Sequence, residues 1–256
     1  MLGGTAGDCV VWAEGERRSL RAVIDPDERS FYRVGAIAAL AVGTAYVVTV
    51  VLYASVGPPP SGGQASLEYL AGKTTVWWGI LGLSVLTDLL FVPVALSLYL
   101  ALKEINRNAM LVATAFVGLF VVLDLAVTWS NYASLIVLSG DYAIANEAQR
   151  AADVAAASYA SAVLSSPLER VYAIVILSSA ILVIGFVMLE GRFGKATAYL
   201  ARIVGVLGIV SIAGLTVTII MNAIVATVWM FVVGYRLYRL GSQRGTASSR
   251  PSPVNR

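Results

Sequence analysis

Two aspartates stand out because each lies inside a run of apolar residues long enough to cross a lipid bilayer. Asp88 lies 14 residues before Leu102, and Asp124 lies 15 residues after Ala109. At a rise of 1.5 Å per helical residue, both carboxyl groups should lie about 21–23 Å from the short polar connection between the two runs. A carboxylate at this depth costs at least ~2.5 kcal/mol on insertion scales. We therefore expect both side chains to point into a helix bundle at the same level.

This pair has no cationic partner nearby in the sequence, because neither apolar run contains Lys or Arg. Two desolvated carboxylates without a counter-charge favour a shared proton or a bound cation, which is the usual chemistry of a proton or sodium site. We predict that Asp124 is the primary carboxylate, that Asp88 shares its proton, and that neutral polar side chains complete the site. The predicted ion- or proton-binding residues are Asp88, Asp124, Thr128, Asn131 and Ser84.

A polar stripe continues from this pair toward the external side. Residues three or four apart share a helix face, and Thr128, Asn131 and Ser134 follow Asp124 at this spacing. We expect a polar cleft that opens to the outside and is closed on the inner side by apolar residues. A second interpretation stays open: polar side chains in membrane helices also serve as interhelical glue, at about 0.6 kcal/mol per hydrogen bond.

Composition defines the class of protein that must hold these residues. Of 256 residues, 58% are hydrophobic and 13% charged, whereas soluble domains have about 45–50% and 25%. Apolar stretches of about 20 residues, the length needed to cross a bilayer, recur along the chain. We predict an all-α polytopic membrane helix bundle in the cell membrane, with the lipid bilayer as its surroundings.

Residue types that are missing exclude several kinds of chemistry. The absence of histidine excludes His-ligated haem, His-based zinc sites and Ser-His-Asp triads. One cysteine, Cys9, cannot form an intramolecular disulfide. The last lysine, Lys195, falls in a polar loop, so a Schiff base buried in a helix is not expected. We predict no cofactor, no metal site, no catalytic residue and, without a basic stripe among aromatics, no nucleic-acid partner.

Hydropathy divides the chain into six transmembrane helices, with Trp77 and Trp78 as interfacial anchors of the second. The stretch from Ala196 to Leu240 is long enough for two spans with a tight turn near Gly214 to Thr218, and one very long span is the alternative. We predict a cytoplasmic N-terminal segment over residues 1–30, a transmembrane domain over 31–241 and a disordered cytoplasmic tail over 242–256. The predicted spans are about 34–56, 75–102, 109–138, 171–189, 197–215 and 218–238.

The distribution of basic residues favours six spans with both termini in the cytoplasm. In that topology fifteen of the 18 Lys and Arg residues are cytoplasmic, and only Lys73, Arg150 and Arg170 are external. Such a bias follows the positive-inside rule. Five spans would place the basic residues of the C-terminal end outside and weaken the bias.

Two features lie between the third and fourth spans. Residues 139–166, rich in Ala and Ser, form a weakly amphipathic pattern that predicts an external helix, either lying on the bundle or extending the third span. Ser166-Pro167-Leu168-Glu169 then predicts a capping box at the start of the fourth span. Glu169 is interpreted here as a capping residue only.

The end of the last span provides a family resemblance. Trp229, Gly234 and the run Tyr235-Arg236-Leu237-Tyr238-Arg239-Leu240-Gly241 resemble the close of a large group of bacterial six-helix integral membrane proteins of uncharacterised activity. The resemblance extends loosely over residues 30 to 241 and includes an Asp in the second span. It implies the six-helix architecture and carries no activity to transfer.

These observations lead to two main hypotheses of function. The first is a small transporter or binding protein in which the Asp pair holds a proton, a cation or a cationic solute. The alternative is a non-catalytic structural or assembly subunit of a membrane complex, or a homo-oligomer. An intramembrane aspartyl protease is not expected, because Leu86-Thr87-Asp88-Leu89 lacks a Gly-rich context.

Overall fold

The computed structural model describes residues 26–191, 193–213 and 216–242, and within them every regular element is a helix. This confirms the all-α fold class. Most of the predicted N-terminal segment and C-terminal tail lies outside the described residues, as does Gly214. The elements are α2 Pro26–Val56, α3 Gly63–Ala71, α4 Thr74–Leu123, the π-helix η1 Asp124–Trp129, α5 Ser130–Ile144, α6 Glu147–Leu164, α7 Pro167–Arg170, the π-helix η2 Val171–Val175, α8 Ile176–Leu189, α9 Lys195–Val210, the 3-10 helix η3 Ser211–Ala213 and α10 Thr216–Ser242.

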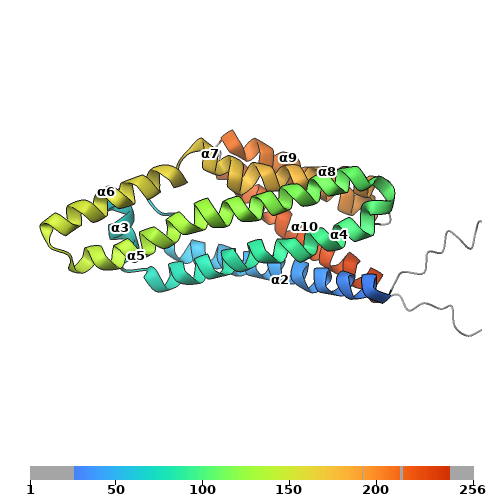
Figure 1. The fold of residues 1–256 in the computed structure, drawn as a ribbon, viewed down its shortest axis with the longest axis horizontal. Helices are drawn as coiled ribbons and strands as arrows, with labels where there is room; N and C mark the ends of the chain where they lie inside the picture. Colours follow the sequence, from blue (N-terminus) through green and yellow to red (C-terminus); the bar gives the residue numbers. More distant parts are fainter. Residues whose placement is uncertain (1–25, 192, 214–215, 243–256) are drawn as a thin grey trace, which may run out of the picture.

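In the described part of the chain, five helical stretches are long and apolar enough to cross a membrane: Arg29–Val56, Thr74–Ile144, Pro167–Leu189, Lys195–Ala213 and Val217–Ser242. The second of these has 71 residues and joins α4, η1 and α5. Its backbone leaves the helical conformation at Asn106, with φ −149° and ψ 90°. Figure 1 shows the green ribbon of α4 doubling back on itself.

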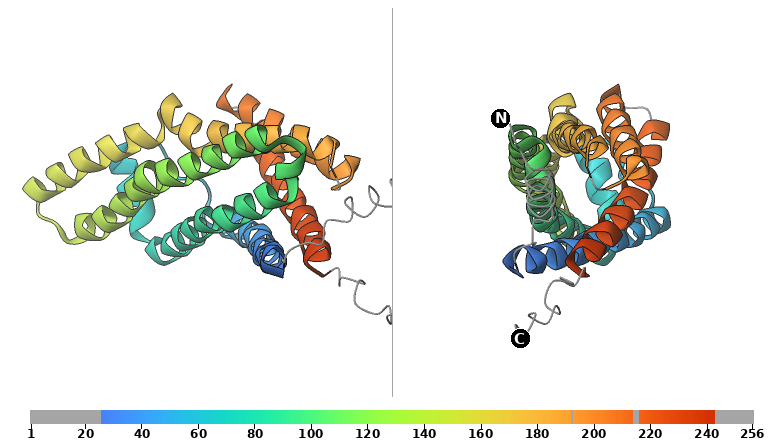
Figure 2. Two further views of the ribbon diagram at one scale, coloured as in Figure 1. Left: turned by 45° about the vertical axis from the view of Figure 1, so that its right-hand side comes forward. Right: turned by 90° about the vertical axis from the view of Figure 1, so that its right-hand side faces the viewer.

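The bundle is built from long helices that pack side by side (Figure 1). α2 packs between α10 and α4, α8 packs against α9 and α4, and α9 also contacts α10. Figure 2 shows these helices grouped around a common axis in the end-on view. The start of α2, the end of α10 and the reversal of α4 all lie at the same end of the bundle (Figure 1).

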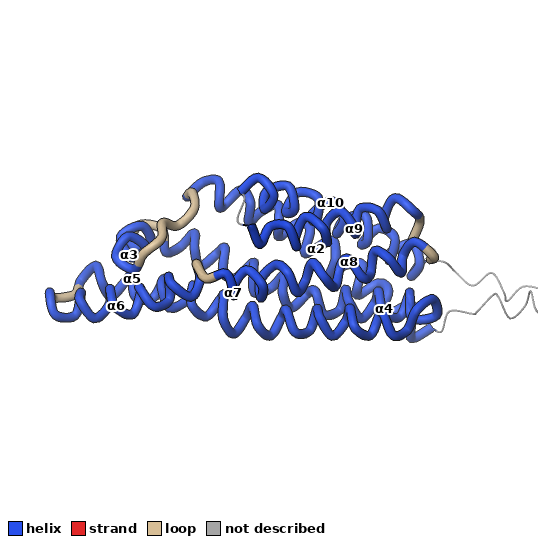
Figure 3. Tube along the Cα trace, turned by 90° about the horizontal axis from the view of Figure 1, so that it is seen from above, coloured by secondary structure: helices blue, strands red, loops and turns tan. Residues whose placement is uncertain are grey.

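The opposite end of the molecule has a hydrophobic core of its own. There α3, α5 and α6 pack together, as Figure 3 shows from above. Trp77 is 1% exposed in this cluster and stacks on Tyr132, with ring centroids 5.6 Å apart. The prediction that Trp77 is an interfacial anchor is therefore wrong, because α3 and α5 cover its indole. Trp78, the next residue, is 47% exposed.

The segment predicted as an external helix is divided in two. α5 extends the predicted third span to Ile144, and α6 begins at Glu147 and runs back toward the bundle. Asn146 caps α6, because its side chain accepts a hydrogen bond from the backbone N–H of Gln149 at 3.0 Å. The alternative that extends the third span describes α5, whereas α6 packs on α5 and α3.

α8 and α9 approach closely where glycines leave room for backbone contact. A Cβ atom built on Gly205 would lie 2.6 Å from the Cβ and 2.8 Å from the Cα of Leu182. Small residues at such crossings allow close packing of membrane helices. The two helices must therefore separate if this position carries a side chain.

We predict that Gly205→Ala lowers the free energy of unfolding by about 1–3 kcal/mol, the usual range for overpacking. Thermal unfolding in detergent, followed by circular dichroism, measures the effect. Gly118→Ala is the matched control, because no atom lies within 4 Å of a Cβ built there; it should stabilise the helix by up to about 1 kcal/mol. Equal behaviour of the two variants would contradict the close crossing.

Candidate functional site

The two aspartates predicted from the sequence face each other in the interior of the bundle. Asp88 of α4 is 3% exposed and Asp124, the first residue of η1, is 4% exposed. The indole Nε1 of Trp129 donates to Asp88 Oδ2 at 2.7 Å and to Asp124 Oδ2 at 3.1 Å. The two carboxyl groups also lie within hydrogen-bonding reach of each other. The reversal of α4 therefore brings together residues 36 positions apart.

Trp129 is part of the site because of a local change in helix type. In a regular α-helix, residue i+5 points about 140° away from residue i, at 3.6 residues per turn. Residues 124–129 instead form a π-helix, whose wider i→i+5 turn brings Asp124 and Trp129 to the same side. Sequence reasoning missed Trp129 because it assumed the α-helical period. The one available signal was that a buried indole N–H usually needs an acceptor.

A third carboxylate, Glu169, joins the site through Thr128. Thr128 is 4% exposed, and its Oγ1 donates to Glu169 Oε1 at 3.4 Å. Thr128 also contacts the Asp124 carboxyl group. The hydroxyl thus lies between the aspartate pair and Glu169.

Only half of the predicted capping box forms. Ser166 Oγ accepts a hydrogen bond from the backbone N–H of Glu169 at 3.1 Å, as predicted. The reciprocal donor, the backbone N–H of Ser166, is instead bonded to the carbonyl of Val163 at 3.1 Å. Glu169 is therefore free to turn toward Thr128. Because the sequence pattern was interpreted as a capping box, the contact between Glu169 and Thr128 was not predicted.

The other two predicted ligands are placed differently. Asn131 Nδ2 donates to the carbonyl of Val127 on its own helix at 2.7 Å. Its side chain lines a second hollow, of about 750 Å³, between α5 and α6. Ser84 is 8% exposed, and its carbonyl accepts from Thr87. Within the described ranges, neither side chain has a recorded bond to an aspartate carboxylate.

Aromatic rings close the site on both sides along the helix axis. Toward α3 and α6, Trp129 packs on Tyr132, which stacks on Trp77. Toward the reversal of α4, Phe91 and Phe120 meet edge to face at 5.9 Å. Bulky rings therefore occupy the space next to the pair, while farther along the predicted polar stripe Asn131 and Ser134 line the second hollow between α5 and α6.

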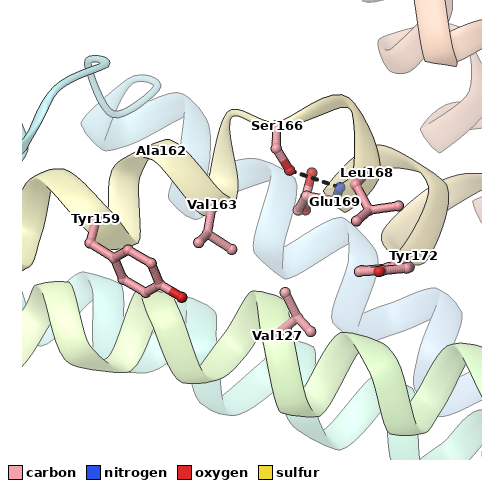
Figure 4. A pocket seen from close by; sticks show the side chains of 8 residues that line it. All are labelled: Val127, Tyr159, Ala162, Val163, Ser166, Leu168, Glu169 and Tyr172. Atoms are coloured by element: carbon pink, nitrogen blue, oxygen red, sulfur yellow. Dashed lines mark hydrogen bonds between the residues drawn. The ribbon is translucent and has the colours of Figure 1, made fainter.

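A smaller hollow lies on the side of the bundle that carries Glu169. It has a volume of about 420 Å³ and lies beside Glu169, between α6, α7 and η1. Figure 4 shows Tyr159 and Val163 pointing from α6 toward the helix that carries Val127. The hollow is lined by Val127, Tyr159, Ala162, Val163, Ser166, Leu168, Glu169 and Tyr172.

No Lys or Arg side chain of the described residues neutralises the Asp88–Asp124 pair. Within the described ranges, the two aspartates interact with Trp129, Thr128, Tyr46, Tyr132, Glu169 and each other, and none of these is Lys or Arg. Asp124 Oδ1 is buried without a hydrogen-bond partner. The same described residues contain no group of three or more His, Cys, Asp or Glu suited to a metal ion. The arrangement can hold a proton between two carboxyl groups, or a cation beside them.

Comparison with known proteins adds no further assignment. No protein-family model matches the chain, and neither a curated protein nor a solved structure matches it. The resemblance to bacterial six-helix membrane proteins stays an expectation from the sequence.

The bridging indole gives a spectroscopic prediction. Hydrogen bonds to carboxylates are shorter and stronger than those to neutral acceptors. In ¹⁵N-tryptophan-labelled protein, the Trp129 indole proton should resonate downfield and exchange slowly with water, whereas that of the exposed Trp78 exchanges fast. Asp88→Asn or Asp124→Asn should move the Trp129 resonance upfield. Asp153→Asn is the control, because Asp153 is a buried aspartate on α6, and this substitution should leave the Trp129 resonance unchanged. If the Trp129 resonance does not move in the Asp88 and Asp124 variants either, the bridging hydrogen bonds are contradicted.

Proposed function

We propose that this chain is a small membrane transporter or binding protein that holds a proton, a cation or a cationic solute at the Asp88–Asp124 pair. The observation that carries the proposal is the bridging indole. One N–H donor lies between two buried carboxyl groups, and no cationic side chain is among their recorded partners in the described residues. Two carboxylates in such surroundings cannot both be ionised without a large desolvation and repulsion cost.

A shared proton resolves this problem. Asp124 Oδ1 lacks a donor in the protein, and a protonated Asp88 carboxyl within reach would supply one. The pair then carries a single negative charge, which the Trp129 N–H stabilises. A cation that approaches through Thr128 and Glu169 can take the place of that proton. Exchange of a proton for a cation at one site is the elementary step of a coupled transporter.

The proposed topology has six spans and cytoplasmic termini. The stretch Thr74–Ile144 would be about 105 Å long as one straight helix, several times the bilayer core of about 30 Å. The break at Asn106 supports counting it as two crossings. The positive-inside bias of the sequence then orients the bundle, with the reversal of α4 and both ends of the chain in the cytoplasm.

The alternative function, a structural or assembly subunit, is favoured by a different feature. α5 and α6 reach past the bundle and, together with α3, form a helical end with its own core. Ile144 at the tip of α5 is 89% exposed. An exposed apolar side chain on a projecting end fits contact with a partner protein. Purification of a stable complex that the Asp88→Asn/Asp124→Asn double variant still forms would support this alternative.

We predict that Asp88→Asn and Asp124→Asn each reduce proton or sodium flux to the level of empty liposomes, because an amide cannot exchange a proton at this site. The measurement uses reconstituted protein, a pH-sensitive dye and imposed sodium or pH gradients. Asp153→Asn is the matched control, since Asp153 is also a buried aspartate (8% exposed) but lies on α6. Thermal unfolding verifies that all three variants fold. Flux at the wild-type level in both the Asp88→Asn and the Asp124→Asn variants would contradict the proposal.

The topology gives a labelling prediction. In a Cys9→Ser background, Asn108→Cys beside the reversal of α4 and Ala148→Cys on α6 are both at exposed positions. A membrane-impermeant maleimide applied from outside intact cells should label the Ala148 variant only. The Asn108 variant should react only after the membrane is permeabilised, as should wild-type Cys9. Labelling of Asn108→Cys from outside would reverse the proposed orientation.

A further inference from the structure

The lateral hollow beside Glu169 combines three features that are not explained by helix packing alone. Its volume of about 420 Å³ lies within the range of about 300–1,000 Å³ that is usual for small-molecule sites. It opens between α6 and η1, where Figure 4 shows side chains of both helices facing the same space. Four of its lining residues, Val127, Ala162, Val163 and Leu168, are apolar.

A single carboxylate gives the apolar wall a charge preference. Glu169 is the one charged residue among those that line the hollow. Its neighbour Arg170 does not line it, and the Arg170 guanidinium donates to the carbonyl of Ile212 at 3.5 Å. Arg170 acts on the Glu169 carboxyl electrostatically from outside the hollow, and this is the weakest of the influences on that group. An anionic group in partly apolar surroundings still favours a positively charged occupant.

Two tyrosines add a second source of attraction for a cation. Tyr159 and Tyr172 both line the hollow, and Tyr159 is 72% exposed. Aromatic faces attract organic cations, with the largest gain where water is excluded. A hydrated inorganic ion gains little from apolar and aromatic walls, whereas a cation with apolar substituents uses all of them.

The hollow is connected to the aspartate pair by one hydroxyl. Glu169 Oε1 lies 3.4 Å from Thr128 Oγ1, and Thr128 in turn contacts Asp124. A positive charge bound at Glu169 is thus close enough to weaken the hold of the pair on its shared proton. The connection needs no movement of the aromatic layers.

From these observations we infer that the hollow binds an amphipathic organic cation, an ammonium-type ion with apolar substituents, and that Glu169 is its anionic partner. This inference rests on the proposed function, because it names the class of solute that the Asp88–Asp124 pair would serve. Binding displaces the shared proton of the pair to solvent, and no covalent bond is formed or broken in the solute. The apolar substituents lie against Val127, Val163 and Leu168, between the two tyrosine rings.

The test uses tetraphenylphosphonium as the probe, with the full-length chain in detergent micelles and equilibrium dialysis against empty micelles. Wild-type protein should bind the probe saturably. Glu169→Gln should weaken binding by about tenfold or more, as expected for loss of a charge partner in a partly desolvated site. Ala162→Phe, which fills the hollow, should abolish binding. Sodium chloride should reduce probe binding no more than potassium chloride does at equal ionic strength.

Matched controls separate the hollow from general effects of charge or bulk. Glu147→Gln changes another acidic residue in the first turn of a helix. Ala155→Phe adds the same ring at an exposed position two turns away on α6 and outside both hollows. Both controls should bind the probe like wild type. Absence of saturable binding, or equal binding by Glu169→Gln, Ala162→Phe and their controls, overturns the inference.

The outcome is distinguishable from that of the proposed function. Proton or sodium flux that depends on both aspartates, without probe binding, refutes the organic-cation site and leaves the proposed function standing. Probe binding that depends on Glu169 and Ala162, in a protein without aspartate-dependent flux, supports the hollow and refutes the transport proposal. Proton release on probe binding, measured in weak buffer and lost in Asp124→Asn, supports both.

Discussion

The hydrogen bonds from one indole N–H to two buried carboxyl groups impose the main constraint on this structure. A carboxylate removed from water needs donors or a counter-charge. Here the hydrogen-bond donor to both carboxyl groups is the indole of Trp129, and the Thr128 hydroxyl, which donates to Glu169, lies beside Asp124. Both residues belong to the π-helix that begins with Asp124. That helix type places residues i+4 and i+5 on the side of residue i. The constraint therefore acts on the backbone as well as on side chains.

The surroundings of the pair determine how a proton or solute could reach it. Aromatic side chains lie on both sides of the carboxyl groups along the bundle, with Trp129 and Tyr132 on one side and Phe91 and Phe120 on the other. The polar contacts run sideways instead, from Asp124 through Thr128 to Glu169 and the hollow at the surface. A proton or solute that reaches the pair along these contacts would therefore approach from the side of the bundle.

The helical end formed by α3, α5 and α6 has a direct effect on this lateral approach. α6 contributes Tyr159, Ala162 and Val163 to the wall of the hollow. α3 packs on both α5 and α6, and the side chain of Ser161 on α6 accepts a hydrogen bond from the backbone N–H of Gly62 at 3.0 Å. A movement of α6 would therefore change the width of the hollow and the fit of α3 together. The functional hypothesis and the structural alternative concern adjoining parts of the molecule.

The sequence alone determined the helical class and the burial of the two aspartates, because hydropathy and the cost of charge in an apolar environment depend only on composition and spacing. The equal depth of Asp88 and Asp124 also followed from counting residues, since helical rise is constant. Tertiary structure decided which faces meet: it put Trp129 beside Asp124 through a π-turn, turned Glu169 from its cap toward Thr128, and placed the side chain of Asn131 along the second hollow. It also buried Trp77 under α3 and α5. These outcomes depend on helix rotation and on contacts between distant segments, which the period of a single helix does not encode.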